Sequence, residues 1–464
     1  MTLPVLDVNL MLAPALPRTG GSTGGGSRGI DPARLEGDLA AGFRAAHRAV
    51  EERRAGGEIG FFDLPWAAET ARCVQEVADS FGQIFENVVV LGIGGSGLGA
   101  ITLRDALLGP LWNERSVEQR DYFPRLYVLD NPDPATVGPF LERLDLRRTL
   151  FNVVSKSGST AETMALYLVI RDRLARLVEP DQLRGHFLFT TDPARGALRR
   201  IAEAEGIPTL AVPANVGGRY SVLSPVGLWP AAVTGIDIDA LLAGAGAMVD
   251  RCRTDVLVAN PAGLFATLLH AADTENRQPI HVLMPYSDRL RSLALWFQQL
   301  WAESLGKGLT GPTPLPAVGA TDQHAQVQLF MEGPLDKVVA FVAVRDPGDP
   351  VAIPPLHGEI PELGYLGGHT LGELLDAERR ATAEALRQGG RPSLTIELQR
   401  VDAHALGALF MMLQIATVYA GALYGVDPLD QPGVELGKRL TYGLLGRSGF
   451  QAPALGNGDP RWRV

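Results

Sequence analysis

Short apolar segments that alternate with stretches of helical pattern are the feature of this sequence that most restricts its fold. Between residues 87 and 212 the apolar segments are short and rich in Val, Leu and Phe. Strands separated by helices are typical of a parallel sheet with helices on both faces. We therefore predict a doubly wound sheet, with strands at 87–93, 125–129, 150–154, 186–189 and 209–212.

A second set of apolar segments follows later in the chain, at 279–284, 337–344 and 393–398. New helical pattern opens near residues 235–250, where we place a domain boundary. The predicted fold class is α/β, with two doubly wound αβα sandwich domains and a helical C-terminal tail. We expect an N-terminal arm at 1–55, a first domain at 56–235 and a second domain at 236–464.

Two regions of this predicted layout lack regular structure. The Gly/Ser-rich stretch at 19–29 has the composition of a flexible linker, so we expect a loose arm before it. Helical pattern follows from 31 to 54. The segment 346–368 is rich in Pro and Gly and is expected to form a long loop.

Charge and cysteine content exclude several classes of protein. The 464 residues carry a net charge of −10, which argues against a broad nucleic-acid-binding face. The two cysteines, Cys73 and Cys252, are too few for a disulfide scaffold and lack metal-ligand spacing. We expect a cytoplasmic protein that meets any anionic ligand through local positive charge.

One segment, 405–425, is long and apolar enough to cross a bilayer. Because no other segment resembles a span, we interpret it as a helix buried in a large α/β core. The start of the chain has no basic region before its apolar residues, so it does not resemble a signal peptide. We therefore expect no membrane association.

A glycine-rich turn follows the first predicted strand, in the sequence VVVLGIGGSGLG. Gly92, Gly94 and Gly97 match the G-x-G-x-x-G pattern of dinucleotide-binding turns. Asp130, at the end of the next strand, follows Gly97 by 33 residues, which is far for a ribose-binding acid. A dinucleotide site and a tight structural turn therefore remain equally open.

The loop after the third predicted strand reads SKSGST and precedes a helix. Its hydroxyls and the free backbone N–H groups at the helix N-terminus suit one phosphate group, and Lys156 adds positive charge. The alternative is an N-cap that needs no ligand. A cap needs one hydroxyl and this loop supplies four, so we favour a phosphorylated small molecule over an extended dinucleotide.

The helix expected from residue 288 to the glycine at 306 carries Gln299 and Glu303 on one face, because they are spaced i, i+4. A carboxylate in the last helical turn opposes the helix dipole by about 0.3–1 kcal/mol. Glu303 is therefore placed where stability does not favour an acid. The alternative is a structural ion pair between Glu303 and Lys307.

Three further residues are candidates for polar chemistry. His324 lies among polar residues after a Pro-rich loop, and histidine suits acid–base work near neutral pH, although a lone histidine is usually structural. Lys438 lies on a helix expected from about residue 433, where it could equally be a solvated surface charge. Arg219 lies in a turn after a strand, where a phosphate contact and a surface role are both open.

Six segments taken together resemble the phosphoglucose isomerase family, in that family's order and approximate spacing. They cover most of the chain from about 87 to 440, and six in order are highly specific. The segments are GIGGSGLG, VSKSGSTAET, GGRYSVLS, FQQLWAESLGKG, GATDQHAQ and DQPGVELGK.

The resemblance implies two sugar-isomerase-type domains, and an enzyme that interconverts glucose 6-phosphate and fructose 6-phosphate through an enediolate. It implies no metal and no cofactor, and a homodimer whose active sites are shared between subunits. The implied catalytic residues are Glu303 as the base, Arg219 beside the enediolate, and Lys438 with His324 of the neighbouring subunit for ring opening. The implied substrate-binding residues are Gly95, Ser96, Ser155, Lys156, Ser157, Thr160, Gln299 and Gln431.

Three alternatives stay open at this point. A dual phosphoglucose/phosphomannose isomerase would use the same residues, and turnover of mannose 6-phosphate would identify it. A sugar-phosphate-binding protein without activity would need only the Ser/Thr loop, so Glu303, His324 and Lys438 argue against it. A dinucleotide-dependent dehydrogenase would show stabilisation by NAD, which we do not expect.

Overall fold

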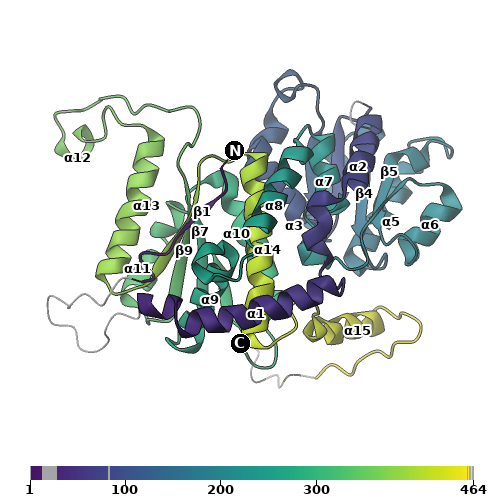
Figure 1. Cartoon of the computed structure of the whole chain (residues 1–464). Coiled ribbons are helices and arrows are strands. Elements are labelled where there is room, and N and C mark those ends of the chain that lie inside the picture. Colours follow the sequence, from purple (N-terminus) through teal and green to yellow (C-terminus); the bar gives the residue numbers. More distant parts are fainter. Residues whose placement is uncertain (1, 13–28, 82–83, 457, 459–460, 462–464) are drawn as a thin grey trace.

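The computed structural model describes residues 2–12, 29–81, 84–456, 458 and 461. It contains two five-stranded sheets (Figure 1). The first sheet has the strand order β3-β2-β4-β5-β6 and is parallel throughout. Its strands are β2 (Asn87–Leu91), β3 (Arg125–Leu129), β4 (Thr149–Ser155), β5 (Phe187–Thr191) and β6 (Thr209–Ala211).

Helices cover both faces of the first sheet because its strands are apolar on both sides. Val89 and Leu91 of β2 belong to one hydrophobic cluster, whereas Val88 and Val90 belong to another. The first cluster is closed by α4 (Pro134–Arg143), α5 (Ala161–Leu174) and α6 (Ala197–Glu205). The opposite face packs on α2 (Ala68–Phe81), α3 (Leu98–Leu103) and α7 (Pro225–Val233).

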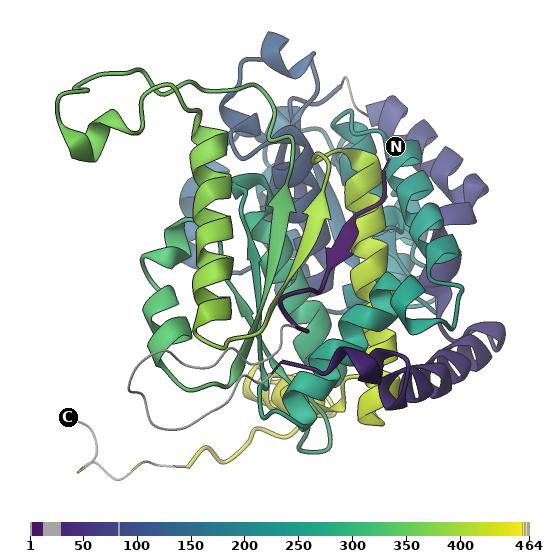
Figure 2. The same ribbon diagram turned by 60° about the vertical axis from the view of Figure 1, so that its left-hand side comes forward.

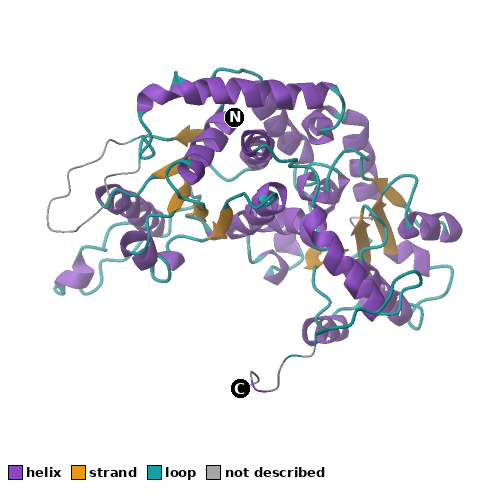
Figure 3. Cartoon of the chain, turned by 90° about the horizontal axis from the view of Figure 1, so that it is seen from below, coloured by secondary structure: helices purple, strands orange, loops and turns teal. Residues whose placement is uncertain are grey.

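The second sheet has the order β1-β10-β9-β7-β8, in which only the edge strand β1 is antiparallel. Its strands are β1 (Val5–Asp7), β7 (Ile280–Pro285), β8 (Thr313–Pro316), β9 (Lys337–Val344) and β10 (Ser393–Leu398). One face packs on α11 (Val327–Glu332) and α13 (Leu371–Gln388). The other face packs on α9 (Pro261–Thr274) and α10 (Arg291–Leu305). The prediction of doubly wound sheets is confirmed, and Figure 3 shows the two groups of strands among helices.

The predicted buried helix is confirmed as α14 (Ala403–Tyr424). It is long and apolar enough to cross a membrane, but 89% of its apolar window is buried inside the protein. It packs against α8 (Ile238–Arg251), α9, α10 and α1 (Asp38–Ala55). Its sequence is apolar all round because protein surrounds it, as Figure 1 shows in the middle of the molecule.

The expectation of a loose arm before the Gly/Ser-rich stretch is wrong at β1. Val5 pairs with Glu397 and Asp7 with Thr395, so this strand extends the second sheet (Figure 2). Three residues carry too little periodicity for a strand to be predicted. Most of the Gly/Ser-rich stretch lies outside the described residues. The expected helix at 31–54 is a 3₁₀ turn, Pro32–Leu35, followed by α1.

Two other differences from prediction have simple causes. Strand β8 was not predicted because its sequence, TPLP, has a proline at every second position. The predicted loop at 346–368 contains a short helix, α12 (Pro361–Gly364), and Ala352 forms an isolated bridge with Thr370. At the C-terminus, the predicted helix is α15 (Glu435–Leu444), preceded by a 3₁₀ turn at Pro432–Val434.

The order of the strands in the first sheet determines where a ligand can bind. Strand β2 lies between β3 and β4, so the connection after β2 leads to one side of it and the connection after β3 crosses to the other side. Open α/β sheets bind ligands at such a switch point, outside the carboxyl ends of the strands. The glycine turn Gly94–Ser96 follows β2 and the Ser/Thr loop follows β4. Both predicted motifs therefore lie at this switch point.

Candidate active site

The glycine turn after β2 lies directly against the turn that carries Arg219. A Cβ atom on Gly95 would lie 2.6 Å from the backbone nitrogen of Arg219 and would overlap the carbonyl group of Gly218. Gly94 has φ +58°, and a Cβ there would lie 2.8 Å from Nε2 of Gln299. Glycine is required at both positions because two backbone segments and one side chain meet there.

Arg219 is buried and donates hydrogen bonds to several chain segments. It lies in the 3₁₀ turn Gly218–Tyr220 and is 4% exposed. Its Nε donates to Oγ of Ser304 at 2.7 Å, and its Nη1 to Oε1 of Gln431 at 2.8 Å. Its Nη2 donates to the carbonyl oxygens of Pro428 (2.6 Å) and Asp430 (2.9 Å). Arg219 therefore joins the end of α10 to the 427–431 segment.

Glu303 faces this arginine. Its Oε1 lies 3.3 Å from Nη1 of Arg219, and its Oε2 accepts a hydrogen bond from Nε2 of Gln299 at 2.9 Å. The structural alternative of a pair with Lys307 is wrong, because in the described residues Lys307 pairs with Asp430 at 3.0 Å. Glu303, Gln299, Arg219 and Gln431 therefore come together beside the glycine turn.

The hydroxyl groups of the Ser/Thr loop also come together. Oγ of Ser155 lies 2.8 Å from Oγ1 of Thr160 and 3.5 Å from Oγ of Ser157. Thr160 is the N-cap residue of α5, but its side chain makes no cap hydrogen bond in the described structure. The simple N-cap alternative is therefore wrong for Thr160. The cluster lies at the N-terminus of α5, where an anion is stabilised by backbone N–H groups.

Lys156 lies in the same loop, but its ammonium group is engaged by the protein. Nζ donates to the carbonyl oxygens of Ala214 at 2.6 Å and Val216 at 2.8 Å. Partial burial lowers the pKa of Lys156 from its ordinary value. The side chain thus ties the Ser/Thr loop to the segment that leads to Arg219.

The structure does not bring His324 and Lys438 to this cluster. Among the hydrogen bonds and ion pairs of the described residues, none joins either side chain to Glu303. His324 is exposed after the 3₁₀ turn Thr321–Gln323. Lys438 lies on the exposed helix α15, where Nζ pairs with Oε1 of Glu435 at 2.8 Å. In the described part of the chain, neither residue forms a hydrogen bond or ion pair with another predicted site residue.

Two supporting residues were missed by sequence reasoning. Ser304 is fully buried and accepts from Arg219, and Tyr220 Oη lies 3.1 Å from the same Ser304 oxygen. Burial raises the pKa of Tyr220 to about 12, so its phenol stays protonated and donates to Pro428. Ser304 directly follows Glu303 in the segment FQQLWAESLGKG, and this position was the one signal that could have indicated its role.

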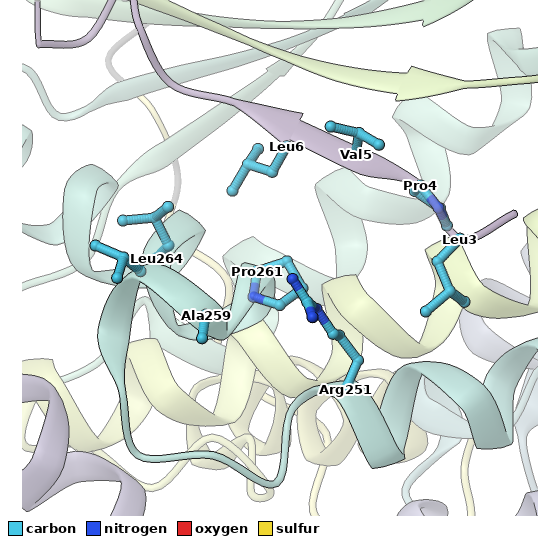
Figure 4. A pocket seen from close by; sticks show the side chains of 9 residues that line it. Leu3, Pro4, Val5, Leu6, Arg251, Ala259, Pro261 and Leu264 are labelled. Carbon is cyan, nitrogen blue, oxygen red and sulfur yellow. The ribbon is translucent and has the colours of Figure 1, made fainter.

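Other features lie apart from this cluster. A cavity of about 290 Å³ lies between β1, the end of α8 and the start of α9 (Figure 4). Its lining is apolar apart from Arg251, and none of its nine residues is a predicted site residue. Among the described residues, no group of three or more His, Cys, Asp or Glu side chains is arranged to hold a metal ion.

Comparison with solved structures identifies the fold. The chain superposes on a hypothetical protein from Thermus thermophilus with a TM-score of 0.83 and 39% identity, covering 96% of this chain and 100% of that one. It shares its fold with a glucose-6-phosphate isomerase from Chlamydia trachomatis, with a TM-score of 0.79 and 22% identity. This match covers 90% of this chain and 87% of that one. The fold is therefore the α/β fold of phosphosugar isomerases.

Comparison of sequences identifies the family within this class. The family model for phosphoglucose isomerase matches residues 69–334 and 373–448. A glucose-6-phosphate isomerase of Rubrobacter xylanophilus is 48% identical over 85% of this chain and 90% of its own length. A glucose-6-phosphate isomerase of Carboxydothermus hydrogenoformans is 43% identical over 88% of this chain and 89% of its own length. The chain belongs to the phosphoglucose isomerase family.

Proposed function

We propose that this protein catalyses the reversible isomerisation of glucose 6-phosphate and fructose 6-phosphate. The observation that carries this proposal is the convergence of Glu303, Arg219 and Gln299 beside the glycine turn, at the carboxyl ends of β2 and β4. The reaction needs a base that moves a proton between neighbouring carbons, and a cation beside the oxygen that becomes negative. These groups supply both.

Glu303 is the proposed base. Its side chain is 26% exposed, so a substrate can reach it. The hydrogen bond from Gln299 orients one oxygen, which leaves the other directed toward Arg219. After ring opening, Glu303 takes the proton from the carbon next to the carbonyl and returns it to the neighbouring carbon.

Arg219 is the proposed stabiliser of the enediolate. A guanidinium group has five N–H donors, and four of them bind protein acceptors here. The remaining donor is on Nη1, the nitrogen that lies nearest Glu303. This fifth N–H is engaged only by the ion pair with Glu303, where charge develops, and the other four hold the guanidinium group in place before the reaction starts.

The other predicted residues complete the proposed site. Ser155, Ser157 and Thr160 hold the phosphate, with Lys156 in support, because their hydroxyls gather at the N-terminus of α5. The sugar contacts Gly95, Ser96, Gln299 and Gln431. Ring opening uses Lys438 and His324 of the second subunit of a homodimer. The exposed position of His324 supports this assignment, since it is accessible to a second subunit.

The proposal also covers where the protein works. Its two cysteines, exposed Cys73 and buried Cys252, are both free, as the reducing cytoplasm allows. We therefore propose a cytoplasmic enzyme that acts on a soluble sugar phosphate.

The decisive experiment measures turnover of fructose 6-phosphate by the purified protein in EDTA. The product is oxidised by added glucose-6-phosphate dehydrogenase, and the rate of NADPH formation is recorded. We expect turnover by the native protein, and mannose 6-phosphate is tested in parallel as a substrate. Binding of fructose 6-phosphate without turnover would instead indicate a binding protein and would contradict the proposal.

A further inference from the structure

Lys307 follows the helix that carries Glu303 and holds a second chain segment against it. Its Nζ donates to the carbonyl oxygen of Ser304 at 2.9 Å and to the carbonyl oxygen of Asp427. It also pairs with Oδ1 of Asp430 at 3.0 Å. The side chain is only 14% exposed. Three acceptors from two distant parts of the chain therefore meet at one ammonium group.

The 427–431 segment has no regular secondary structure, so side chains determine its position. Arg53 donates two hydrogen bonds to Oδ1 of Asp427, both at 3.0 Å. Arg219 donates to the carbonyl oxygens at 428 and 430, and Tyr220 donates to the first of these. The segment ends at Gln431, which itself accepts from Arg219. Its position and the orientation of Arg219 therefore depend on each other.

We propose that Lys307 is a positioning residue for the isomerase reaction. By holding the 427–431 segment on the end of α10, it keeps Arg219 and Gln431 in position beside Glu303. The inference rests on the proposed function, since it concerns the same site. Lys307 is not placed in contact with the substrate and acts through the segment that it holds.

The chemistry of the ammonium group suits this role better than a guanidinium group. An ammonium is compact and points three donors in different directions, whereas the guanidinium donors lie in one plane. The chain contains only four lysines, Lys156, Lys307, Lys337 and Lys438, and 38 of its 42 basic residues are arginine. Of these lysines, Lys156 and Lys307 both bind backbone carbonyl oxygens next to segments of the site.

Removal of the ammonium leaves partly buried carbonyl oxygens without their donor. Such groups cost free energy unless they find water, so the 427–431 segment moves to hydrate them. The Ser/Thr loop makes no contact through Lys307, so phosphate binding is preserved. We therefore expect a loss in kcat that is larger than any loss in phosphate affinity.

The test compares Lys307→Met with Lys337→Met, using the full-length protein. Lys337 is a matched control, because it is also buried, but it binds Asp336 and Pro334 at the start of β9 and no site residue. We expect Lys307→Met to lower kcat for fructose 6-phosphate at least about tenfold. Inhibition by inorganic phosphate should stay within about twofold of the native value. Lys337→Met should keep the native kcat.

Two further variants separate positioning from charge and from folding. Lys307→Arg keeps the charge but not the geometry, so we expect it to stay well below native kcat; full activity would overturn the inference. Asp430→Asn removes the negative charge that pairs with Lys307, at an exposed position, and keeps the protein testable if Lys307→Met fails to fold. We expect a smaller fall in kcat, about two- to fivefold, for Asp430→Asn.

The outcomes distinguish this inference from the proposed function. A native protein without turnover would overturn the function itself. An active native protein, with Lys307→Met within about twofold of its kcat, would overturn only the role of Lys307. Equal losses in kcat and in phosphate affinity would show a general structural role and would also overturn it.

Discussion

At the scale of single residues, the site is built from groups that local stability alone does not favour. Glu303 lies in the last turn of α10, where a negative charge opposes the helix dipole. The buried guanidinium of Arg219 compensates this charge at 3.3 Å. Each member of the pair would be unfavourable without the other, which is typical of side chains held for chemistry.

Replacing Glu303 with Gln tests the proposed base directly. The amide keeps the size and the contact to Gln299 but cannot take a proton, so kcat should fall at least about a hundredfold with little change in KM. Steady-state kinetics with fructose 6-phosphate measure both constants. Glu142→Gln, an exposed change on α4, is the control. Near-normal turnover by Glu303→Gln would remove the residue from its role.

Replacing Gly95 with Ala tests the close approach of the two backbone turns. The added methyl group would overlap the carbonyl group of Gly218 and displace Arg219. We expect a loss of at least about 1 kcal/mol in the free energy of unfolding, together with reduced kcat. Gly42→Ala is the matched control, because it lies in α1 with open space around it and should be neutral or stabilising. Equal stabilities in urea unfolding would contradict this account.

At the scale of elements, the carboxyl ends of parallel strands bring separate loops to one edge of the first sheet. Strands β2 and β4 are neighbours in register, with Leu91 opposite Val153, so the glycine turn and the Ser/Thr loop emerge side by side. Helix α10 then lays Gln299 and Glu303 against the glycine turn. The loops supply binding groups, whereas the helix supplies the proposed base.

The Ser/Thr loop is tested by replacing Ser157 and Thr160 with Ala together. If these hydroxyls bind the phosphate in the ground state as in the transition state, KM should rise and kcat should change little. The control removes two exposed helical hydroxyls, Ser80 and Thr274, which bond only to carbonyls in their own helices. An unchanged KM would show that the phosphate binds elsewhere.

Helix α10 is anchored to the second sheet by a hydrogen bond from Trp301 to Nδ1 of His281 at 3.1 Å. Burial lowers the pKa of His281 from its ordinary value of 6.5 to about 3. Above pH 6.5 the imidazole is neutral in both states. Below it, the unfolded chain takes up a proton that the folded protein does not accept until about pH 3, so stability falls as pH falls.

Urea unfolding at several pH values tests this linkage. His281→Gln can still accept from Trp301 but does not titrate, so it lacks this contribution. Relative to the variant, the native protein should lose about 2 kcal/mol of unfolding free energy between about pH 7.5 and pH 5. Parallel curves for the two proteins would show that His281 is protonated in the folded state.

At the scale of the whole molecule, one chain does not assemble every predicted site residue. Glu303, Arg219, Gln299 and Gln431 converge, but in the described residues His324 and Lys438 form no hydrogen bond or ion pair with them. The proposed homodimer supplies His324 from the second subunit. A site shared between subunits can be restored by mixing two inactive variants, whereas a site within one chain cannot.

Mixing two inactive variants tests the shared site. In a heterodimer of Glu303→Gln and His324→Ala chains, one site lacks both groups and the other is intact. Random re-association of equal amounts should therefore restore about a quarter of native activity, since half of the dimers are mixed and each has one intact site. Activity is measured after co-refolding. A mixture no more active than its components would place both groups in one chain.

Much of the fold was predictable because a strand that is buried on both faces forms a short, continuous apolar segment in the sequence. Strands β3, β9 and β10 have the predicted bounds, and β2, β4, β5, β6 and β7 differ at their ends by one or two residues. Strands β1 and β8 were missed, because three residues, or a segment with two prolines, show no periodicity. Their places depend on the edges that neighbouring strands offer.

The alternation of elements, the glycine turn, the Ser/Thr loop and the place of Glu303 on its helix could be predicted, because these features depend on residues close together in the chain. The contacts between distant groups could not be predicted and are known only from the fold. It paired Glu303 with Arg219 instead of Lys307, directed Lys156 to backbone carbonyls and left α15 exposed with Lys438. The physical reason is that pairing between distant segments depends on burial and on competing acceptors, which local spacing does not specify.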